Sequence, residues 1–316
     1  VDGELSSSFN TTDWFQKSEV RIPLYSGLEA VPHDVVIVKL TEPQFNAKRI
    51  TPNYVIFTGL EGSEHMAVSP PPSAPQRKIE FLGDSITAGD CNLCMPDPVN
   101  ATPSWHNQDQ RLAWPSLICD ALDAECHVEA WSGLGLTLGC CKQPMSASEP
   151  MSKVWFRTLA SEQSLNIFDK DGTQPANLWN FTGWKPDALV INLGTNDVMG
   201  GWPWIKQSFN TTYLALVEKA VAHYGLSTHV FLACGPMTHK HCESVKWVVE
   251  HAAAAFRDLK ISYLDQTHFL NGSYGPRCCY HPSASVHSAM ASAGTKFIGN
   301  AMGWERNPMV NLSSRP

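Results

Sequence analysis

The sequence predicts an α/β protein whose main domain is a parallel sheet covered by helices on both faces. From residue 78 onward, short apolar strands alternate with helical segments, and this alternation is typical of a parallel sheet. The expected strands cover residues 78–82, 127–131, 188–192, 229–233 and 261–264, and the clearest helices cover 208–224, 244–259 and 284–302. In such sheets the active site lies at the carboxyl ends of the strands.

The first seventy residues follow a different pattern. Short β-branched or aromatic runs lie between turn residues at 20–24, 34–40 and 54–57, and no helical period is visible. A stiff, proline-rich stretch follows and separates the two patterns. We therefore predict a small β-rich domain at residues 1–70, a linker at 71–77 and an α/β domain at 78–316.

Composition and charge exclude several classes of protein. The 316 residues are 43% hydrophobic and 17% charged, which is typical of a folded globular chain. The formal net charge is −7, and no basic stripe indicates a nucleic-acid partner. The apolar runs have the length of strands and fall short of the roughly 18–20 residues that a membrane span needs.

Cysteines and glycosylation sequons together indicate an oxidising, secretory route. The chain has ten cysteines, and six asparagines begin an Asn-X-Ser/Thr triplet. We expect several disulfides, with short loops favouring Cys119–Cys126 and Cys234–Cys242. The CxxC at 91–94 has no second CxxC to complete a zinc site. The predicted glycosylation sites are Asn10, Asn100, Asn180, Asn210, Asn271 and Asn311.

Two motifs carry a candidate nucleophile and base. Ser85 lies in Gly83-Asp84-Ser85-Ile86-Thr87, directly after the first expected strand, where a tight turn can expose its hydroxyl above the sheet. The alternative is an ordinary helix N-cap serine. His281, in Tyr280-His281-Pro282-Ser283, precedes the final helix and can serve as base to Ser85. His287 is a rival base, but it falls inside that helix.

Two further motifs offer donors to an oxyanion. Gly133, in Ser132-Gly133 after the second expected strand, leaves a backbone N–H open. Asn196, in Gly194-Thr195-Asn196-Asp197 after the third, can donate from its side chain. Each motif could instead be a plain turn.

The four motifs in this order resemble the SGNH/GDSL hydrolase superfamily, and the resemblance covers residues 78–302. It implies an SGNH-type three-layer α/β/α fold and a serine nucleophile at Ser85. It further implies an oxyanion hole made by the N–H groups of Ser85 and Gly133 and the side chain of Asn196. His281 would act first as general base and then as general acid. The implied mechanism needs no metal and no cofactor.

The sequence departs from this family at one position. The family has an aspartate three residues before the histidine, and here that position is Cys278. The imidazole N–H is then held either by a backbone carbonyl, giving a Ser–His dyad, or by another carboxylate that the sequence does not name. We favour the dyad, although losing an orienting carboxylate can cost orders of magnitude in rate.

The β-rich first domain, the linker and the dyad together resemble carbohydrate esterase family two. That family joins a jelly-roll β-sandwich to an SGNH domain and removes acetyl groups from xylan and related polysaccharides. The resemblance implies a secreted acetylesterase acting on O-acetylated polysaccharide or oligosaccharide. Trp202 and Trp204, just past Asn196, could stack on a sugar. The stretch 237–242 could be mistaken for a metal cluster, but no carboxylate or second histidine pair supports that interpretation.

Two alternative functions stay open. The same site could hydrolyse a lipid or a small ester, because SGNH sites host many esters. The chain could also be a catalytically silent carbohydrate-binding or extracellular coat protein. This alternative stays open because Cys278 occupies the position of the family's aspartate. A jelly roll needs about eight strands, and residues 1–70 offer only four or five. We therefore interpret Val1 as a processed end and expect the first strands to come from a cleaved N-terminal chain of the same precursor.

Overall fold

The computed structural model forms two compact units. One comprises Val1–Lys39 and Asn53–Ala74, and the other comprises Leu40–Pro52 and Pro75–Pro316. The structure describes residues 1–2, 7–9, 20–23, 26–27, 29, 31–42, 57–62, 66–69, 74–93, 105–139, 150–158, 178–199, 204–270 and 277–312.

The first unit contains neither helix nor strand among its described residues. The strand expected at 34–40 lies almost wholly in this unit and is exposed. Its residues form no ladder with any other described segment, so the prediction of a strand there is wrong. Asp2 makes the local contacts instead, accepting hydrogen bonds from the backbone N–H of Asp34 at 2.8 Å and from His33 Nδ1 at 2.7 Å. Residues 24 and 54–56 lie outside the described part, and the β-sandwich stays a prediction.

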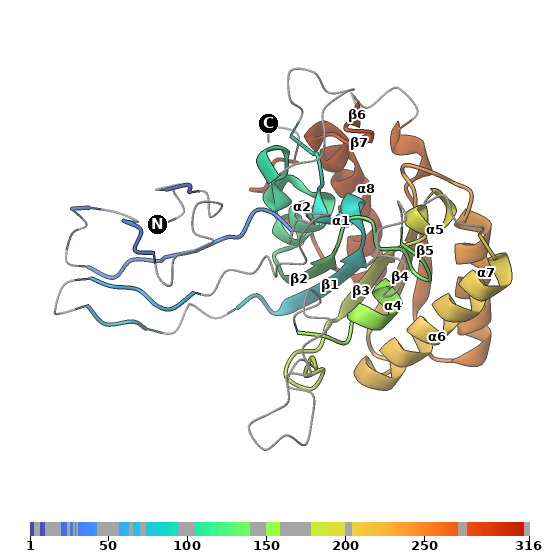
Figure 1. Ribbon diagram of the computed structural model, residues 1–316. Coiled ribbons are helices and arrows are strands. Elements are labelled where there is room, and N and C mark those ends of the chain that lie inside the picture. The colour runs from blue at the N-terminus through green and yellow to red at the C-terminus, as the bar shows by residue number, and fades with distance from the viewer. Residues whose placement is uncertain are drawn as a thin grey trace, which may run out of the picture. The chain divides into compact units, whose positions relative to one another are not determined.

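The second unit contains the expected parallel sheet (Figure 1). Its five strands run in the order β2-β1-β3-β4-β5, and all neighbours are parallel. This is a doubly wound order, in which ligands bind where the strand order reverses, here between β1 and β3. The strands are β1 (Arg77–Gly83), β2 (Ala124–Ala130), β3 (Ala188–Asn192), β4 (His229–Cys234) and β5 (Ile261–Asp265).

Helices cover both faces of the sheet, so the predicted α/β/α fold is confirmed (Figure 1). The helices are α1 (Ser85–Ala88), α2 (Trp114–Leu122), α4 (Met151–Val154), α5 (Thr195–Met199), α6 (Lys206–Tyr224), α7 (Cys242–Ala255) and α8 (Ala284–Met302). Short 3-10 turns lie at η2 (Trp105–Asn107), η3 (Gln110–Leu112) and η4 (Thr267–Leu270), and a small hairpin is formed by β6 (Arg277–Cys278) and β7 (His281–Pro282).

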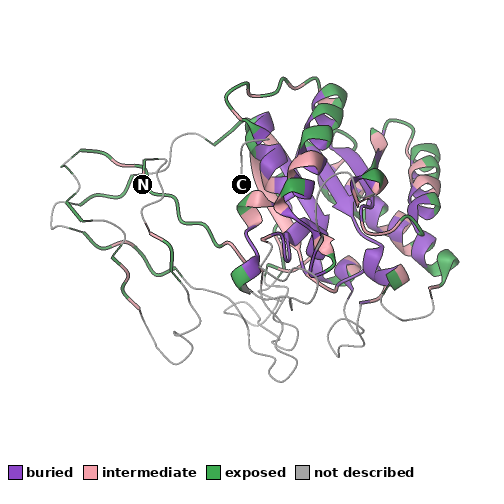
Figure 2. Ribbon diagram, turned by 90° about the horizontal axis from the view of Figure 1, so that it is seen from above, coloured by how far each residue is buried: buried purple, intermediate pink, exposed green. Residues whose placement is uncertain are grey.

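Alternation along the strands divides the core into two layers. In β3, Leu189 and Ile191 pack with α6 and α7, while Ala188 and Val190 pack with α2 and α8. Because both faces are covered, the strand is apolar throughout. Figure 2 shows the buried residues concentrated in the sheet and on the inner helix faces, with exposed residues on the outer faces. No helix among the described residues is long and apolar enough to cross a membrane.

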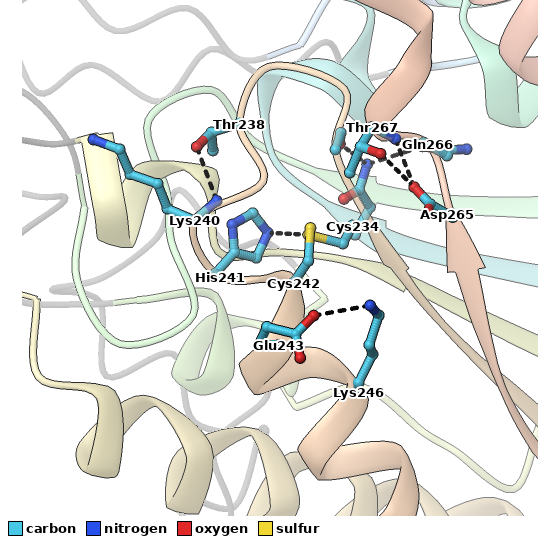
Figure 3. The surroundings of a disulfide bond; sticks show 12 residues. Cys234, Thr238, Lys240, His241, Cys242, Glu243, Lys246, Asp265, Gln266 and Thr267 are labelled. Carbon is cyan, nitrogen blue, oxygen red and sulfur yellow. Dashed lines mark hydrogen bonds and ion pairs between the residues drawn. A yellow bond between two sulfur atoms is a disulfide. The ribbon is translucent and has the colours of Figure 1, made fainter.

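Two disulfides close short loops in this unit, as the sequence predicts. Cys119 in α2 is bonded to Cys126 in β2, and Cys234 at the end of β4 is bonded to Cys242 at the start of α7. Figure 3 shows His241 beside the second bond, with Nε2 3.3 Å from Cys234 Sγ. Burial lowers the pKa of His241 to about 4, so this histidine is neutral at physiological pH.

Candidate active site

Ser85 lies in a strand-to-helix turn at the carboxyl end of β1. Asp84 is the N-cap of α1, and its carboxylate accepts a hydrogen bond from the backbone N–H of Ile86 at 3.0 Å. Gly89, with φ +75°, ends this single turn of helix. Because Asp84 is the N-cap of α1, the alternative interpretation of Ser85 as an ordinary N-cap is wrong. The Ser85 hydroxyl is therefore available for another partner.

That partner is His281. Its Nε2 lies 2.9 Å from Ser85 Oγ, and its Nδ1 lies 2.9 Å from the carbonyl oxygen of Cys279. A carbonyl only accepts, so Nδ1 carries the hydrogen, and in the neutral ring Nε2 is then the acceptor facing the serine hydroxyl. Of the two arrangements that the sequence left open for the imidazole N–H, the structure has the backbone carbonyl.

The hairpin that carries this carbonyl has an unusual turn. Cys278 pairs with His281 in the β6–β7 ladder, so Cys279 and Tyr280 are the two loop residues, with φ +46° and +66°. Two-residue hairpins favour this geometry, but they normally use asparagine or glycine. A non-glycine residue in the left-handed region costs roughly 1–2 kcal/mol. The turn that orients the histidine is therefore held in place by its surroundings.

A carboxylate that the sequence analysis missed also approaches the histidine. Asp90 is buried, and its Oδ2 lies 4.0 Å from His281 Nε2. It reaches the imidazole from the side that faces Ser85 and not from Nδ1, where the family's aspartate would bind. Cys278, at the aspartate's position in the sequence, is disulfide-bonded. In the sequence, the signal for Asp90 was its place directly after the turn of Ser85.

His287, the rival base, has a structural environment. It is fully buried in α8, and its Nδ1 accepts a hydrogen bond from the backbone N–H of Trp114 at 3.2 Å. Burial, with a smaller contribution from the nearby His281, lowers its pKa to about 3. His287 is therefore a neutral core histidine.

The loop with Gly133 is held beneath the site by a second buried acid. Gly133 has φ +82°, which favours glycine. Asp197 accepts hydrogen bonds from the backbone N–H groups of Leu136, Thr137 and Leu138, and from the Thr137 hydroxyl. A Cβ on Gly135 would lie 2.1 Å from the Leu138 carbonyl oxygen and 2.4 Å from Asp197 Oδ2, so only glycine fits there. The Gly194–Asp197 motif thus positions the Gly133 loop, a role that sequence reasoning did not assign to Asp197.

Asn196 lies at the same edge with both amide hydrogens engaged. Its Nδ2 is 3.1 Å from the Leu134 carbonyl oxygen and 3.3 Å from Asp84 Oδ2. Donation to a substrate oxygen would require the longer bond, to Asp84, to be exchanged for one to the substrate. The structure thus brings Asn196 to the edge of the sheet that carries Ser85 and gives it a second acceptor there.

The carboxyl group of Asp84 has a strongly raised pKa. Its side chain is fully buried, and this burial, together with the charge of Asp197, raises the pKa of Asp84 to about 7. Burial also raises the pKa of Asp197, and its hydrogen-bond donors partly offset that rise. The turn of Ser85 therefore contains one buried acid, Asp84, and a second, Asp197, lies near enough for its charge to affect Asp84.

The remaining predicted residues have mixed outcomes. Trp204 is half-buried and packs edge-to-face on Phe209 with a centroid distance of 6.0 Å, so it contacts the core and its proposed sugar contact stays a prediction. Asn210 is buried in α6, which argues against a glycan there, whereas Asn180 and Asn311 are exposed. Trp202, Asn10, Asn100 and Asn271 lie outside the described residues.

Two places in the described structure combine residue types that can bind a metal ion. In the stretch 237–242, the sulfur of Cys242 is used in a disulfide and is not a free thiolate ligand. Asp90, Cys91 and His281 place one ligand atom each within 4.8 Å of the others. A metal ion bound there would take an imidazole nitrogen away from Ser85 or from the Cys279 carbonyl, so it would oppose the Ser–His pair.

A serine hydroxyl on a histidine, at the carboxyl ends of a doubly wound parallel sheet, is the arrangement typical of α/β serine hydrolases. The model of the GDSL-like lipase/acylhydrolase family matches residues 79–293. The chain therefore belongs to this family.

Similar proteins agree with the resemblance to carbohydrate esterase family two. The cellulase/esterase CelE of Acetivibrio thermocellus is 29% identical over 288 residues, which are 90% of this chain and 32% of CelE. An acetylxylan esterase/glucomannan deacetylase of Cellvibrio japonicus is 23% identical over 74% of this chain and 60% of its own length. A family two carbohydrate esterase from Clostridium thermocellum, solved with cellohexaose, is 28% identical with a TM-score of 0.64, covering 75% of this chain and 67% of that one.

This chain thus spans about a third of CelE and three-fifths of the Cellvibrio enzyme.

Proposed function

We propose that this protein is a secreted carbohydrate acetylesterase that uses Ser85 as nucleophile and His281 as base. One observation carries the proposal: Ser85 Oγ lies 2.9 Å from His281 Nε2, while Nδ1 of the same ring is fixed by a carbonyl at 2.9 Å. Fixing Nδ1–H leaves Nε2 free to accept the serine proton, which is the step that activates a serine hydroxyl.

The reaction proceeds in two halves. His281 Nε2 takes the proton of Ser85 as Oγ attacks the acetyl carbonyl carbon. The imidazolium then gives this proton to the sugar oxygen as its bond to the acetyl carbon breaks, so that the sugar leaves as an alcohol. Water then attacks the acetyl-serine, with His281 again taking and returning one proton, and acetate leaves. Asp90, 4.0 Å from Nε2, favours the imidazolium that forms in each half.

The oxyanion that forms in each half needs donors. The proposed donors are the N–H groups of Ser85 and Gly133 and the amide of Asn196. Asn196 releases Asp84 when it donates to the oxyanion, and burial of Asp84, whose pKa is about 7, favours its neutral form once that bond is lost.

The substrate class rests on similarity and on the chain's surroundings. The relatives above are named as a cellulase/esterase, an acetylxylan esterase/glucomannan deacetylase and a family two carbohydrate esterase solved with cellohexaose. On that basis we assign an O-acetylated polysaccharide or oligosaccharide to this chain. The two disulfides and the exposed sequons at Asn180 and Asn311 support export through an oxidising compartment.

Acetate release tests the proposal. Wild type, Ser85→Ala and the exposed-helix control Ser208→Ala are incubated with acetylated xylan, acetylated glucomannan and a nitrophenyl ester series. We expect acetate release by wild type and the control, and loss of more than 10³-fold in Ser85→Ala. Wild type without turnover on any ester would refute the esterase, whereas rates that rise with acyl length would favour a lipid or small-ester hydrolase.

A further inference from the structure

Residues with disfavoured backbone conformations meet beside the candidate site. Cys91, which follows Asp90, has φ +57°, and Cys279 and Tyr280 have φ +46° and +66°. Such conformations in non-glycine residues persist only where the surrounding structure over-determines them, and they concentrate at functional sites. We therefore expect these residues to be held by a specific interaction, such as a hydrogen bond or a covalent bond.

The two cysteines among them contact each other. Cys91 and Cys279 are both buried, and with Cys278 they form a separate apolar cluster. Their thiols are in hydrogen-bonding contact, and Asn107 Nδ2 donates to Cys279 Sγ at 3.4 Å. Both thiols are free in the structure, although the neighbouring Cys278 is disulfide-bonded. Two buried thiols in contact, in a chain that carries other disulfides, are placed to form one more.

Each cysteine is close in sequence to one member of the Ser–His pair. Cys91 lies just past the turn of Ser85, whose carbonyl accepts the backbone N–H of Asp90 at 2.9 Å. Cys279 supplies the carbonyl that holds Nδ1 of His281. A bond between the two sulfurs would join the nucleophile's turn to the base's hairpin at the point where the imidazole is oriented.

We propose that Cys91 and Cys279 form a disulfide in the mature protein, and that this bond is a positioning tie that holds the Ser85 turn to the His281 hairpin. The existence of the bond does not depend on the proposed function, whereas its effect on turnover does.

The oxidation balances with a small-molecule disulfide of the oxidised-glutathione type. The thiolate of one cysteine attacks that disulfide, forms a mixed disulfide and releases one small thiol. The second protein thiolate then attacks the mixed disulfide, forms the Cys91–Cys279 bond and releases the other small thiol. Two protein thiols are oxidised and one small disulfide is reduced, with no net change in protons.

The folded protein slows both the formation and the reduction of this bond. Burial and the charge of Asp90 raise the pKa of the Cys91 thiol, so little thiolate is present once the site has closed. The bond therefore forms as the chain folds, and the closed site afterwards shields it from thiols in solution.

Thiol mapping tests the bond without any activity assay. Protein from a secretory host is denatured without reductant, alkylated, digested after reduction and second labelling, and read by fragment mass spectrometry. We expect both Cys91 and Cys279 to carry only the second label, and Cys279 to carry the first label in a Cys91→Ser variant. First label on both cysteines of the wild type would overturn the proposal, as would Cys279 remaining protected in Cys91→Ser.

Steady-state kinetics test the positioning role. The double variant Cys91→Ser/Cys279→Ser should lose about 10- to 100-fold in kcat with KM changed less than twofold, because small misplacements of a base are costly. The matched control Cys119→Ser/Cys126→Ser removes a disulfide elsewhere, so it should lower the melting temperature and keep kcat. Unchanged kcat in the first variant would overturn the role. If that variant does not fold, Cys279→Ala with Cys91 retained gives the same comparison.

An inactive wild type would refute the esterase while leaving the thiol map to decide on the bond.

Discussion

Asp84 makes the stability of the catalytic domain depend on pH in an unusual direction. Its pKa is raised from the ordinary 3.8 to about 7 by burial. The folded state therefore holds a proton that the unfolded chain has already lost between these two values. The stabilisation that this proton provides is fully present below pH 3.8 and is lost as pH rises through 7.

The size of the effect follows from the shift. A difference of about three pKa units, at 1.36 kcal/mol per unit, amounts to about 4 kcal/mol of unfolding free energy. Asp84→Asn removes this dependence with little change in shape. Asparagine also serves as an N-cap, so the hydrogen bond from the Ile86 N–H can persist. Relative to wild type, the variant should gain about 4 kcal/mol between pH 4 and pH 8.

Urea unfolding at intervals from pH 4 to pH 8 measures this difference. The control is Asp258→Asn, at an exposed position, which should keep the wild-type pH dependence. Parallel stability curves for wild type and Asp84→Asn would refute the reasoning, because they would mean that Asp84 has the same pKa in the folded and unfolded chain.

Four further changes are predicted. His287→Gln should reduce the loss of stability between pH 6.5 and pH 3 by up to about 5 kcal/mol in urea unfolding, because the buried neutral histidine, with its pKa lowered to about 3, binds a proton only when the chain unfolds. Gly135→Ala should lower the melting temperature and kcat together, because its Cβ would meet the Leu138 carbonyl oxygen at 2.1 Å; an unchanged kcat would contradict this. Asp90→Asn should lower kcat/KM about tenfold, because it removes a negative charge 4.0 Å from His281 Nε2; this loss is a fraction of the roughly 4 kcal/mol between unit charges 4 Å apart near a protein surface. Tyr280→Gly should be about 1 kcal/mol more stable than Tyr280→Ala, because only glycine relieves φ +66°; equal stabilities would mean that the turn carries no strain.

Most of the catalytic domain could be predicted from the sequence because its central strands, β1, β3 and β4, are buried on both faces. The expected strand 188–192 and helix 284–302 coincide with β3 and α8. The strand expected at 127–131 instead begins at Ala124, because β2 pairs with β1 along its full length from Arg77. The helix expected to reach 259 ends at Ala255, where the chain turns to bury Leu259. Residues 34–40 have the residue types of a strand but form none, because they make no ladder with another described segment and strand propensity depends on such packing.

The side chains of the site were easier to predict than its supports. The predicted site residues each follow a strand or precede a helix, and the sheet brings such positions to one edge. They are Ser85, Gly133, Asn196 and His281. The group that holds Nδ1 is a backbone carbonyl, which every residue has, so no residue type signals it. Asp90 carries a distinctive side chain, but its approach to His281 depends on how the turn after Ser85 folds back.

Because position 278 is not an aspartate, the imidazole of His281 is held by the backbone carbonyl of Cys279 and not by a side chain. A carboxylate at position 278 could orient the imidazole from any of several backbone conformations, because its side chain can adjust. A carbonyl can do so only if residues 279 and 280 keep φ near +46° and +66°, and Cys-Tyr is a poor sequence for that geometry. A sequence with Asn-Gly would make the same turn without strain, but it would offer no sulfur to Cys91. A turn held by a disulfide needs a cysteine, and the bond can hold the turn in a strained conformation. A turn without such a bond would be expected to have neither the cysteine nor the strain.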